Sequence, residues 1–133
     1  MEINIAVIPG DGIGPEIVDA AEQVLMRVCE IYGHVLNITH VKACSSSIEE
    51  TGESLPEESL KTCLKADAVL LGNTGLEKYK NEPLTKRPEY ALLKLRKELG
   101  VTTNLRPVRL YPALAELSPL NKNIELMFLN IRI

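Results

Sequence analysis

The chain has 133 residues, of which 45% are hydrophobic and 25% are charged, with a formal net charge of -3, and this profile is typical of one soluble globular domain. It has one Phe, four Tyr, no Trp and no basic block, which excludes a protein that stacks nucleic-acid bases over a basic groove. Without a signal-like leader or an apolar run of membrane-spanning length, the chain is expected to be cytoplasmic.

A strand, a glycine-rich turn and a helix are predicted at the start of the chain. Residues 3–8 form a nearly continuous apolar run, as in a strand that is buried on both faces. Apolar residues then recur at spacings of three and four over 17–29, which predicts a helix that Pro15 opens and Gly33 ends. The glycines within 10–14 do not match the dinucleotide fingerprint G-x-G-x-x-G. The pattern therefore leaves a ligand-binding turn and a purely structural turn equally open.

The rest of the chain alternates strand and helix patterns, which indicates an α/β fold. Strands are expected at 35–41, 67–72 and 101–110, and helices at 56–66 and 90–99. The segment 45–54 is polar, with a turn at its Thr-Gly pair. Because Pro107 cannot donate a ladder hydrogen bond, the last strand is not expected to be an ordinary central strand. Ligands bind beyond the carboxyl ends of strands in such sheets, so residues 10–14 and 72–75 are expected to share one rim.

Several polar features are candidates for function. The loop 73–87 is long and without periodicity, and loops of that kind are usually functional or disordered. Arg96 and Arg106 each offer a planar donor fork, and two converging forks suit a di-acid. Arginines on polar surfaces are commonly only solvated, so both interpretations stay open. The three cysteines, at 29, 44 and 63, lack metal-ligand spacing and are expected to be reduced, buried or inert.

Six segments, in order and with compatible gaps, resemble the isocitrate and isopropylmalate dehydrogenase family. They are residues 8–16 (IPGDGIGPE), 51–57 (TGESLPE), 68–72 (AVLLG), 87–89 (RPE), 92–97 (LLKLRK) and 104–108 (NLRPV). The resemblance runs to about Leu120. It implies the three-layer α/β fold of that family, present here as an N-terminal fragment with an incomplete sheet. Residues 1–100 would belong to the first, cofactor-side domain, and residues 101–133 would start the second.

The resemblance also implies a reaction. Members of the family use NAD to oxidise a 2-hydroxy di-acid that then loses carbon dioxide, with Mg²⁺ or Mn²⁺ polarising the forming ketone. By this likeness Arg96 and Arg106 grip the substrate carboxylate. Leu92 occupies the stretch that meets the isopropyl group in the isopropylmalate branch, and a leucine would leave a carboxylate of isocitrate unpaired. The favoured substrate is thus 3-isopropylmalate, in leucine biosynthesis. Tartrate, isocitrate and homoisocitrate are the alternatives.

The cofactor-facing part of the family is similar to a second set of residues here. The implied cofactor-binding residues are Ile13, Gly75, Leu76, Glu77, Lys78 and Glu89. The family's usual Val-Gly-Gly-Pro-Lys-Trp is replaced by Thr-Gly-Leu-Glu-Lys-Tyr at 74–79. The second glycine and the proline are therefore missing from this loop.

A larger departure lies at the end of the chain. By resemblance, the catalytic tyrosine and lysine, the metal-binding aspartates and the adenine-binding loop would all lie beyond Ile133. Arg132 superficially matches a third family arginine, but its register is short by several residues and we interpret it as fortuitous. No catalytic residue or metal ligand is thus expected within the chain, which should be inactive alone, whereas the full-length enzyme should be a homodimer. A non-catalytic remnant of such an enzyme is the alternative.

Overall fold

The computed structural model describes residues 1–117, 119 and 125–131. The chain divides into two compact units, Met1–Leu99 and Gly100–Ile133. Among the described helices, none is both long and apolar enough to cross a membrane. Arg132, which the sequence raised as a possible match to a family arginine, lies outside the described residues.

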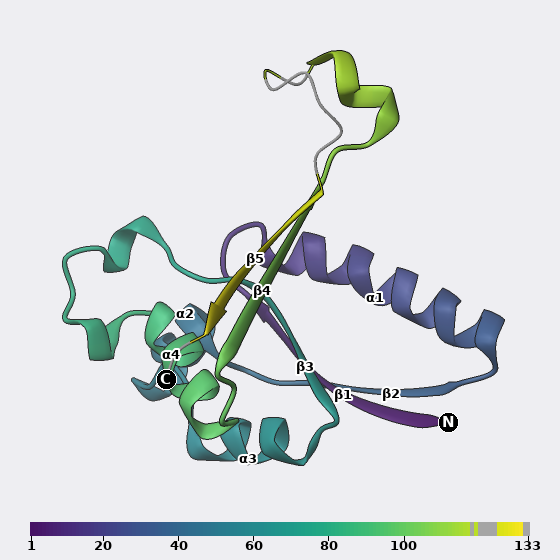
Figure 1. Ribbon diagram of the computed structural model, residues 1–133. Coiled ribbons are helices and arrows are strands. Elements are labelled where there is room, and N and C mark those ends of the chain that lie inside the picture. The colour runs from purple at the N-terminus through teal and green to yellow at the C-terminus, as the bar shows by residue number, and fades with distance from the viewer. Residues whose placement is uncertain (118, 120–124, 132–133) are drawn as a thin grey trace. The chain divides into compact units, whose positions relative to one another are not determined.

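The first unit is built on a parallel sheet of three strands (Figure 1). These are β1 (Glu2–Gly10), β2 (Val35–His40) and β3 (Ala68–Asn73), in the order β2-β1-β3. In the register, Ile5 of β1 lies opposite Ile38 of β2 and Ala68 of β3. The middle of β1, residues 6–8, is at most 1% exposed. The predicted α/β class and the buried central strand are therefore confirmed.

Helices cover both faces of this sheet, with α1 on one side and α2, α3 and α4 on the other (Figure 1). Their bounds are α1 (Gly14–Tyr32), α2 (Cys44–Thr51), α3 (Glu57–Lys65) and α4 (Glu89–Glu98). Side chains alternate along β1, so Ala6 and Ile8 face the side of α2, α3 and α4. They pack there with a buried cluster made of Val41, Ala43, Cys44, Leu55, Leu60, Cys63, Ala91 and Leu95. The first unit therefore has three layers.

The ends of α1 follow the sequence signals. Proline stands in its first turn, where a missing N–H costs nothing, and Glu16 complements the positive end of the helix. Gly33 ends the helix with a left-handed φ of 65°, which glycine adopts without strain. The predicted helix is confirmed, and it begins one residue before Pro15.

The polar segment 45–54 is more regular than its composition suggested. Most of it belongs to α2, a helix that no hydrophobic periodicity indicated. Tertiary hydrogen bonds hold its first turn: the Cys44 N–H donates to the carbonyl oxygen of Ser54 at 2.7 Å, and the Ser45 N–H donates to the Asp11 carboxylate at 2.9 Å. The turn at Thr51-Gly52 is confirmed, because Gly52 ends α2 with a φ of 78°. The loop after β3 likewise contains two short 3₁₀ helices, η1 (Glu77–Tyr79) and η2 (Leu84–Lys86).

The second unit contains a pair of antiparallel strands. These are β4 (Thr103–Arg109) and β5 (Glu125–Ile131), with a 3₁₀ helix, η3 (Pro112–Leu117), after β4. Pro107 lies opposite Met127 in the register. Among the described residues β4 pairs with β5 alone, which agrees with the prediction that the proline strand is not an ordinary central strand. The strand β5 was not predicted.

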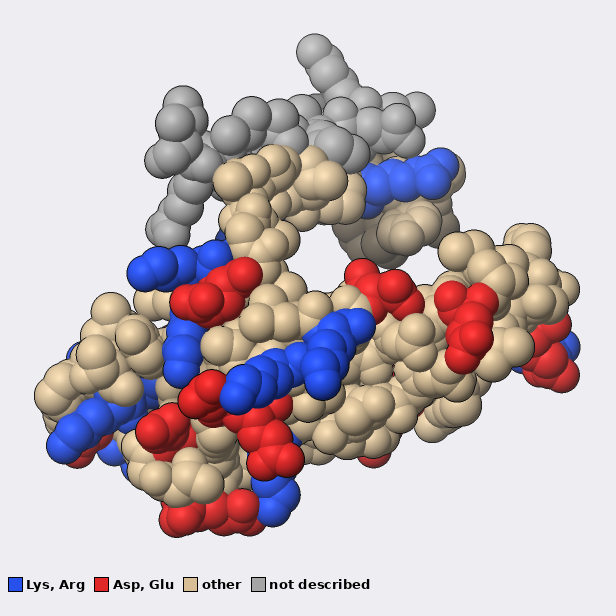
Figure 2. Space-filling view, turned by 90° about the horizontal axis from the view of Figure 1, so that it is seen from below, with Lys and Arg blue, Asp and Glu red and all other residues tan. Residues whose placement is uncertain are grey.

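Charged side chains of both signs lie side by side on the face shown in Figure 2. Ion pairs between exposed groups include Lys61 with Glu57 at 2.7 Å and Lys42 with Glu50 at 2.6 Å. Exposed pairs of this kind each contribute about 0 to 1 kcal/mol. The stability of the first unit therefore depends mainly on its buried cluster.

Candidate functional site

The rim predicted from the glycine turn and the loop after β3 is present in the first unit. Both segments follow the carboxyl ends of neighbouring parallel strands. The Asp11 N–H donates to the carbonyl oxygen of Asn73 at 2.7 Å, and the Gly75 N–H donates to Asp11 Oδ2 at 2.8 Å. The two segments are therefore in direct contact, as expected from the position of the strands.

Asp11, which was not among the site residues predicted from the sequence, lies at the centre of this rim. Its side chain is buried, with the residue 2% exposed. Asp11 Oδ1 accepts the N–H of Ser45 at 2.9 Å and also the hydroxyl of Ser45. An aspartate in a turn usually bonds the backbone two residues on. Because Asp11 instead bonds residues 34 and 64 positions away, no local pattern could have revealed it.

Close backbone packing accounts for some of the rim glycines. A Cβ at Gly10 would overlap the carbonyl oxygen of Asn73, and a Cβ at Gly14 or Gly72 would overlap that of Pro9. Gly12 is different: it has a φ of 58°, and a Cβ there would meet only Leu76 Cδ2, at 3.9 Å. The turn thus has a structural role at Gly10 and Gly14. The ligand-binding interpretation stays a prediction for the open side at Gly12.

The predicted cofactor-facing residues gather around this open side. Ile13 follows Gly12 and is 58% exposed. Gly75 and Leu76 are half-buried, and the exposed Glu89 carboxylate lies beside Gly75, close enough that a Cβ there would be 2.6 Å from Glu89 Oε1. The structure therefore brings together four residues of the predicted cofactor set, which are Ile13, Gly75, Leu76 and Glu89.

Glu77 and Lys78, the other two residues of that set, have partners within the chain. Lys78 forms an ion pair with Glu49 of α2, and its Nζ lies 5.0 Å from the centroid of the Tyr79 ring. Glu77 pairs with Lys80 at 2.8 Å. Both side chains are exposed. Their assignment to the cofactor stays a prediction, and Lys78 in addition fastens the loop to α2.

The predicted substrate-binding residues divide between the two units. Leu92 and Arg96 lie four residues apart on α4, so they share one face of that helix. Leu92 is half-buried and Arg96 is exposed, and Arg106 is exposed on β4 of the second unit. Neither guanidinium group forms a hydrogen bond or an ion pair with another described residue. Both guanidinium groups are therefore available to a ligand.

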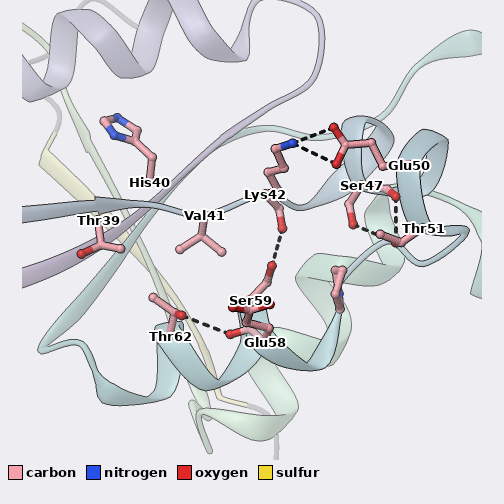
Figure 3. Close-up of a pocket in the computed structure, with 11 residues that line it drawn as sticks. Thr39, His40, Val41, Lys42, Ser47, Glu50, Thr51, Glu58, Ser59 and Thr62 are labelled. Atoms are coloured by element: carbon pink, nitrogen blue, oxygen red, sulfur yellow. Dashed lines mark hydrogen bonds and ion pairs between the residues drawn. The ribbon is translucent and has the colours of Figure 1, made fainter.

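A separate cavity of about 330 Å³ opens among β2, α2 and α3 (Figure 3). None of the predicted substrate or cofactor residues lines it. Polar side chains that line it have partners within the chain: Lys42 Nζ donates to both Glu50 oxygens at 2.6 and 2.9 Å, and the Ser59 hydroxyl donates to the backbone carbonyl oxygen of Lys42 at 2.7 Å. The rim around Asp11, rather than this cavity, is therefore the candidate functional site.

The cysteines are free and buried, as the sequence predicted. Cys44 has a positive φ of 64°, which is unusual for a residue with a side chain. Burial, followed by the nearby carboxylates of Asp11 and Glu89, raises the pKa of the Cys44 thiol to about 12. A neutral thiol is a poor nucleophile.

In the described part of the chain, no group of three or more His, Cys, Asp or Glu side chains is placed to hold a metal ion.

Raising the pH is expected to destabilise the chain through Cys44. The unfolded thiol ionises near 9.0, whereas the folded thiol has a pKa of about 12. The folded chain therefore holds this proton more tightly, and stability falls as the pH rises from 9 towards 12. At about pH 10 the loss is about 1.4 kcal/mol relative to neutral pH. Urea unfolding at neutral pH and at pH 10 measures this loss in the free energy of unfolding. In Cys44→Ala the loss should be smaller by about 1.4 kcal/mol. Equal losses in both chains would contradict the assignment.

Comparison with known proteins places the chain in a family. A model of the isocitrate/isopropylmalate dehydrogenase family matches residues 4–132, extending past Leu120. The chain is 48% identical to a 3-isopropylmalate dehydrogenase from Aquifex aeolicus, covering 91% of this chain and 33% of that protein. It is 44% identical to one from Heyndrickxia coagulans, covering 96% and 36%. The chain thus spans about a third of the length of these relatives.

Solved structures agree on the fold. A β-decarboxylating dehydrogenase from Thermococcus kodakarensis superposes with a TM-score of 0.70 and 30% identity, covering 98% of this chain and 34% of that one. An isocitrate dehydrogenase from Methylococcus capsulatus gives a TM-score of 0.68 at 23% identity, covering 98% and 35%. The predicted family fold is confirmed. The chain belongs to the isocitrate/isopropylmalate dehydrogenase family.

Proposed function

We propose that the chain is the N-terminal part of an NAD-dependent 3-isopropylmalate dehydrogenase of leucine biosynthesis. The observation that carries this proposal is an identity of 44–48% to proteins of that name over more than 90% of the chain. The whole enzyme would act in the cytoplasm as a homodimer. Its Mg²⁺ or Mn²⁺ ligands and its catalytic tyrosine and lysine would lie in the two thirds of the relatives that this chain does not span.

The residues of this chain would bind and orient the reactants. NAD supplies the hydride acceptor, and the open side of the rim, where Gly12 has no side chain and Ile13 and Glu89 are exposed, offers room and polar contact for it. Arg96 and Arg106, whose guanidinium groups have no partner among the described residues, would hold the substrate carboxylates through paired N–H donors. Leu92, one turn before Arg96, would pack on the isopropyl group.

A hybrid enzyme tests the proposal directly. Residues 1–117 of this chain would be joined to the downstream part of the Heyndrickxia coagulans relative. With NAD and Mg²⁺, we expect the hybrid to form NADH from 3-isopropylmalate with a higher kcat/KM than from isocitrate, homoisocitrate or tartrate. Removing the metal with EDTA should abolish this activity. A different substrate ranking would assign the chain to another branch of the family.

The chain of 133 residues alone is the matched comparison. We expect it to form no NADH above background, because the groups that transfer protons and hold the metal would be supplied by the downstream part. Turnover by the isolated chain would overturn this expectation. If the hybrid is inactive although it folds, the alternative of a non-catalytic chain that keeps this part of the fold is favoured.

Leu92 is expected to set substrate preference in the hybrid. Burying its side chain against the isopropyl group contributes about 2 kcal/mol, or roughly thirtyfold in kcat/KM. Leu92→Ser should lose most of this preference and discriminate less against isocitrate, whose extra carboxylate a hydroxyl can meet. Leu64→Ser, the same change at a leucine of α3, is the control and should keep the ranking. An unchanged ranking in Leu92→Ser would place Leu92 in the helix packing instead.

A further inference from the structure

Asp11 connects three segments of the first unit that are far apart in the sequence. They are the turn after β1, the first turn of α2 and the loop after β3. The donors to its carboxylate are two backbone N–H groups and one serine hydroxyl. No lysine, arginine or histidine among the described residues pairs with it. The carboxylate is therefore held by fixed donors, which restrict its orientation more than a mobile cationic side chain would.

The two carboxylate oxygens bond different segments. Oδ1 accepts both donors of Ser45 in α2, whereas Oδ2 accepts the Gly75 N–H of the loop after β3. Because the carboxylate is rigid and planar, it fixes the spacing between these two segments. An asparagine has one acceptor oxygen and can replace only one of these two attachments, the one to Ser45 or the one to Gly75. The link between α2 and the loop thus depends on the carboxylate itself.

The loop fastened in this way carries part of the candidate cofactor site. The Gly75 N–H donates to Asp11, which also accepts hydrogen bonds from Ser45 in the first turn of α2. Three residues after Gly75, Lys78 forms an ion pair with Glu49 of α2. Both attachments therefore connect the loop to α2. Leu76 lies between the two attachments and faces Gly12 of the turn. Asp11 is itself buried and cannot reach a ligand on the open side of the rim.

We propose that Asp11 is a positioning residue, which holds the loop after β3 against the glycine turn so that both present their cofactor-facing side in one arrangement. Asp11 would act through Gly75 and Leu76 and would not touch the cofactor. The link to the cofactor rests on the proposed function, whereas the fastening of the loop can be tested without it.

Asp67 provides a matched control in the same sheet. Its Oδ2 accepts the N–H of Asn4 at 2.8 Å and the side-chain amide of Asn4 at 3.2 Å. Like Asp11, it is a carboxylate that joins the β1 and β3 segments. It does so at the amino ends of these strands, away from the rim. A change of Asp67 to asparagine therefore removes the charge of an exposed carboxylate that joins the same two segments, without altering the rim.

The first test uses the 133-residue chain and measures amide hydrogen exchange by NMR. In Asp11→Asn, the amide that faces the asparagine NH₂ group, that of Gly75 or that of Ser45, should exchange roughly tenfold faster or more, because it loses its bond to the charged acceptor. Leu76 should shift its amide resonance, while Ile5 and Ile38 in the sheet should not change. Asp67→Asn should leave all rim amides unchanged.

If Asp11→Asn does not fold, Ser45→Ala removes one donor only and should give a smaller change in the same direction. Unchanged rim amides in a folded variant would overturn the proposal.

The second test uses the hybrid enzyme and separates positioning from general stability. Asp11→Asn should raise the KM for NAD roughly tenfold, with the KM for 3-isopropylmalate within about twofold of the parent hybrid. Asp67→Asn should change neither value. Equal effects of the two variants on the KM for NAD would contradict the positioning role and show that Asp11 only stabilises the fold. If the parent hybrid has no activity, the proposed function fails, and the exchange measurement still decides whether Asp11 fastens the loop.

Discussion

Gly10→Ala is expected to destabilise the first unit by about 3 to 5 kcal/mol, the largest effect of any single methyl group that we anticipate. The added Cβ would overlap the carbonyl oxygen of Asn73, the oxygen that also accepts the Asp11 N–H. Backbone atoms of two paired strands cannot move apart without losing ladder bonds between β1 and β3. Gly10 also has a φ of 80°, which costs an alanine a further 1 to 2 kcal/mol or so. Urea unfolding followed by circular dichroism measures the loss.

Gly12→Ala is the matched control, since it makes the same change two residues along the same turn. Its φ is also positive, at 58°, but the nearest atom to an added Cβ is a flexible leucine methyl at 3.9 Å. Only the backbone strain remains, so the expected loss is about 1 to 2 kcal/mol. Similar losses in the free energy of unfolding of the two variants would show that the close contact of Gly10 with β3 does not contribute to the destabilisation.

Arg96→Lys and Arg106→Lys are expected to lower kcat/KM for 3-isopropylmalate in the hybrid enzyme by roughly thirty- to a hundredfold each. A guanidinium binds a carboxylate with two parallel donors, whereas an ammonium is a point charge that cannot reproduce this geometry. The loss should appear as a raised KM together with a lowered kcat, because the arginines would orient the substrate as well as bind it. The KM for NAD should change little.

Arg27→Lys is the control for these variants. Arg27 is an exposed arginine of α1 whose partner is Glu30 on the same helix, so its replacement should leave the kinetics unchanged. Initial rates over a range of substrate concentrations, with NAD saturating, give both constants for each variant. Normal kinetics in Arg96→Lys or Arg106→Lys would show that the arginine concerned is only a solvated surface residue.

The parts of the fold that follow from local patterns could be predicted from the sequence. The apolar run of β1, the periodicity of α1 and the proline and glycine at its ends each express a preference of the residues themselves. The contact between the glycine turn and the loop after β3 was also predictable, because parallel strands bring their carboxyl ends to one edge.

The helix α2 and the strand β5 could not be predicted in this way. Three serines in succession favour turns over helix interiors, and α2 forms where the buried Asp11 accepts its first donors. Its first residue, Cys44, even adopts a left-handed φ that its side chain disfavours. In both the fold and the candidate site, the part that escaped prediction therefore depends on contacts between residues distant in the sequence.

The position of β1 in its sheet has a consequence for synthesis of the chain. β1 is the central strand, yet it precedes both of its partners, so neither of its edges can be paired when it leaves the ribosome. About 60 residues separate the ends of β1 and β3, and translation at about 5 to 20 residues per second takes roughly 3 to 12 s to add them. In the first part of this interval the apolar run of residues 5–8 has open backbone donors on both sides, and after β2 has been made the edge that pairs with β3 stays open. A chaperone that binds extended apolar segments would therefore find its best target in the strand that becomes the most deeply buried.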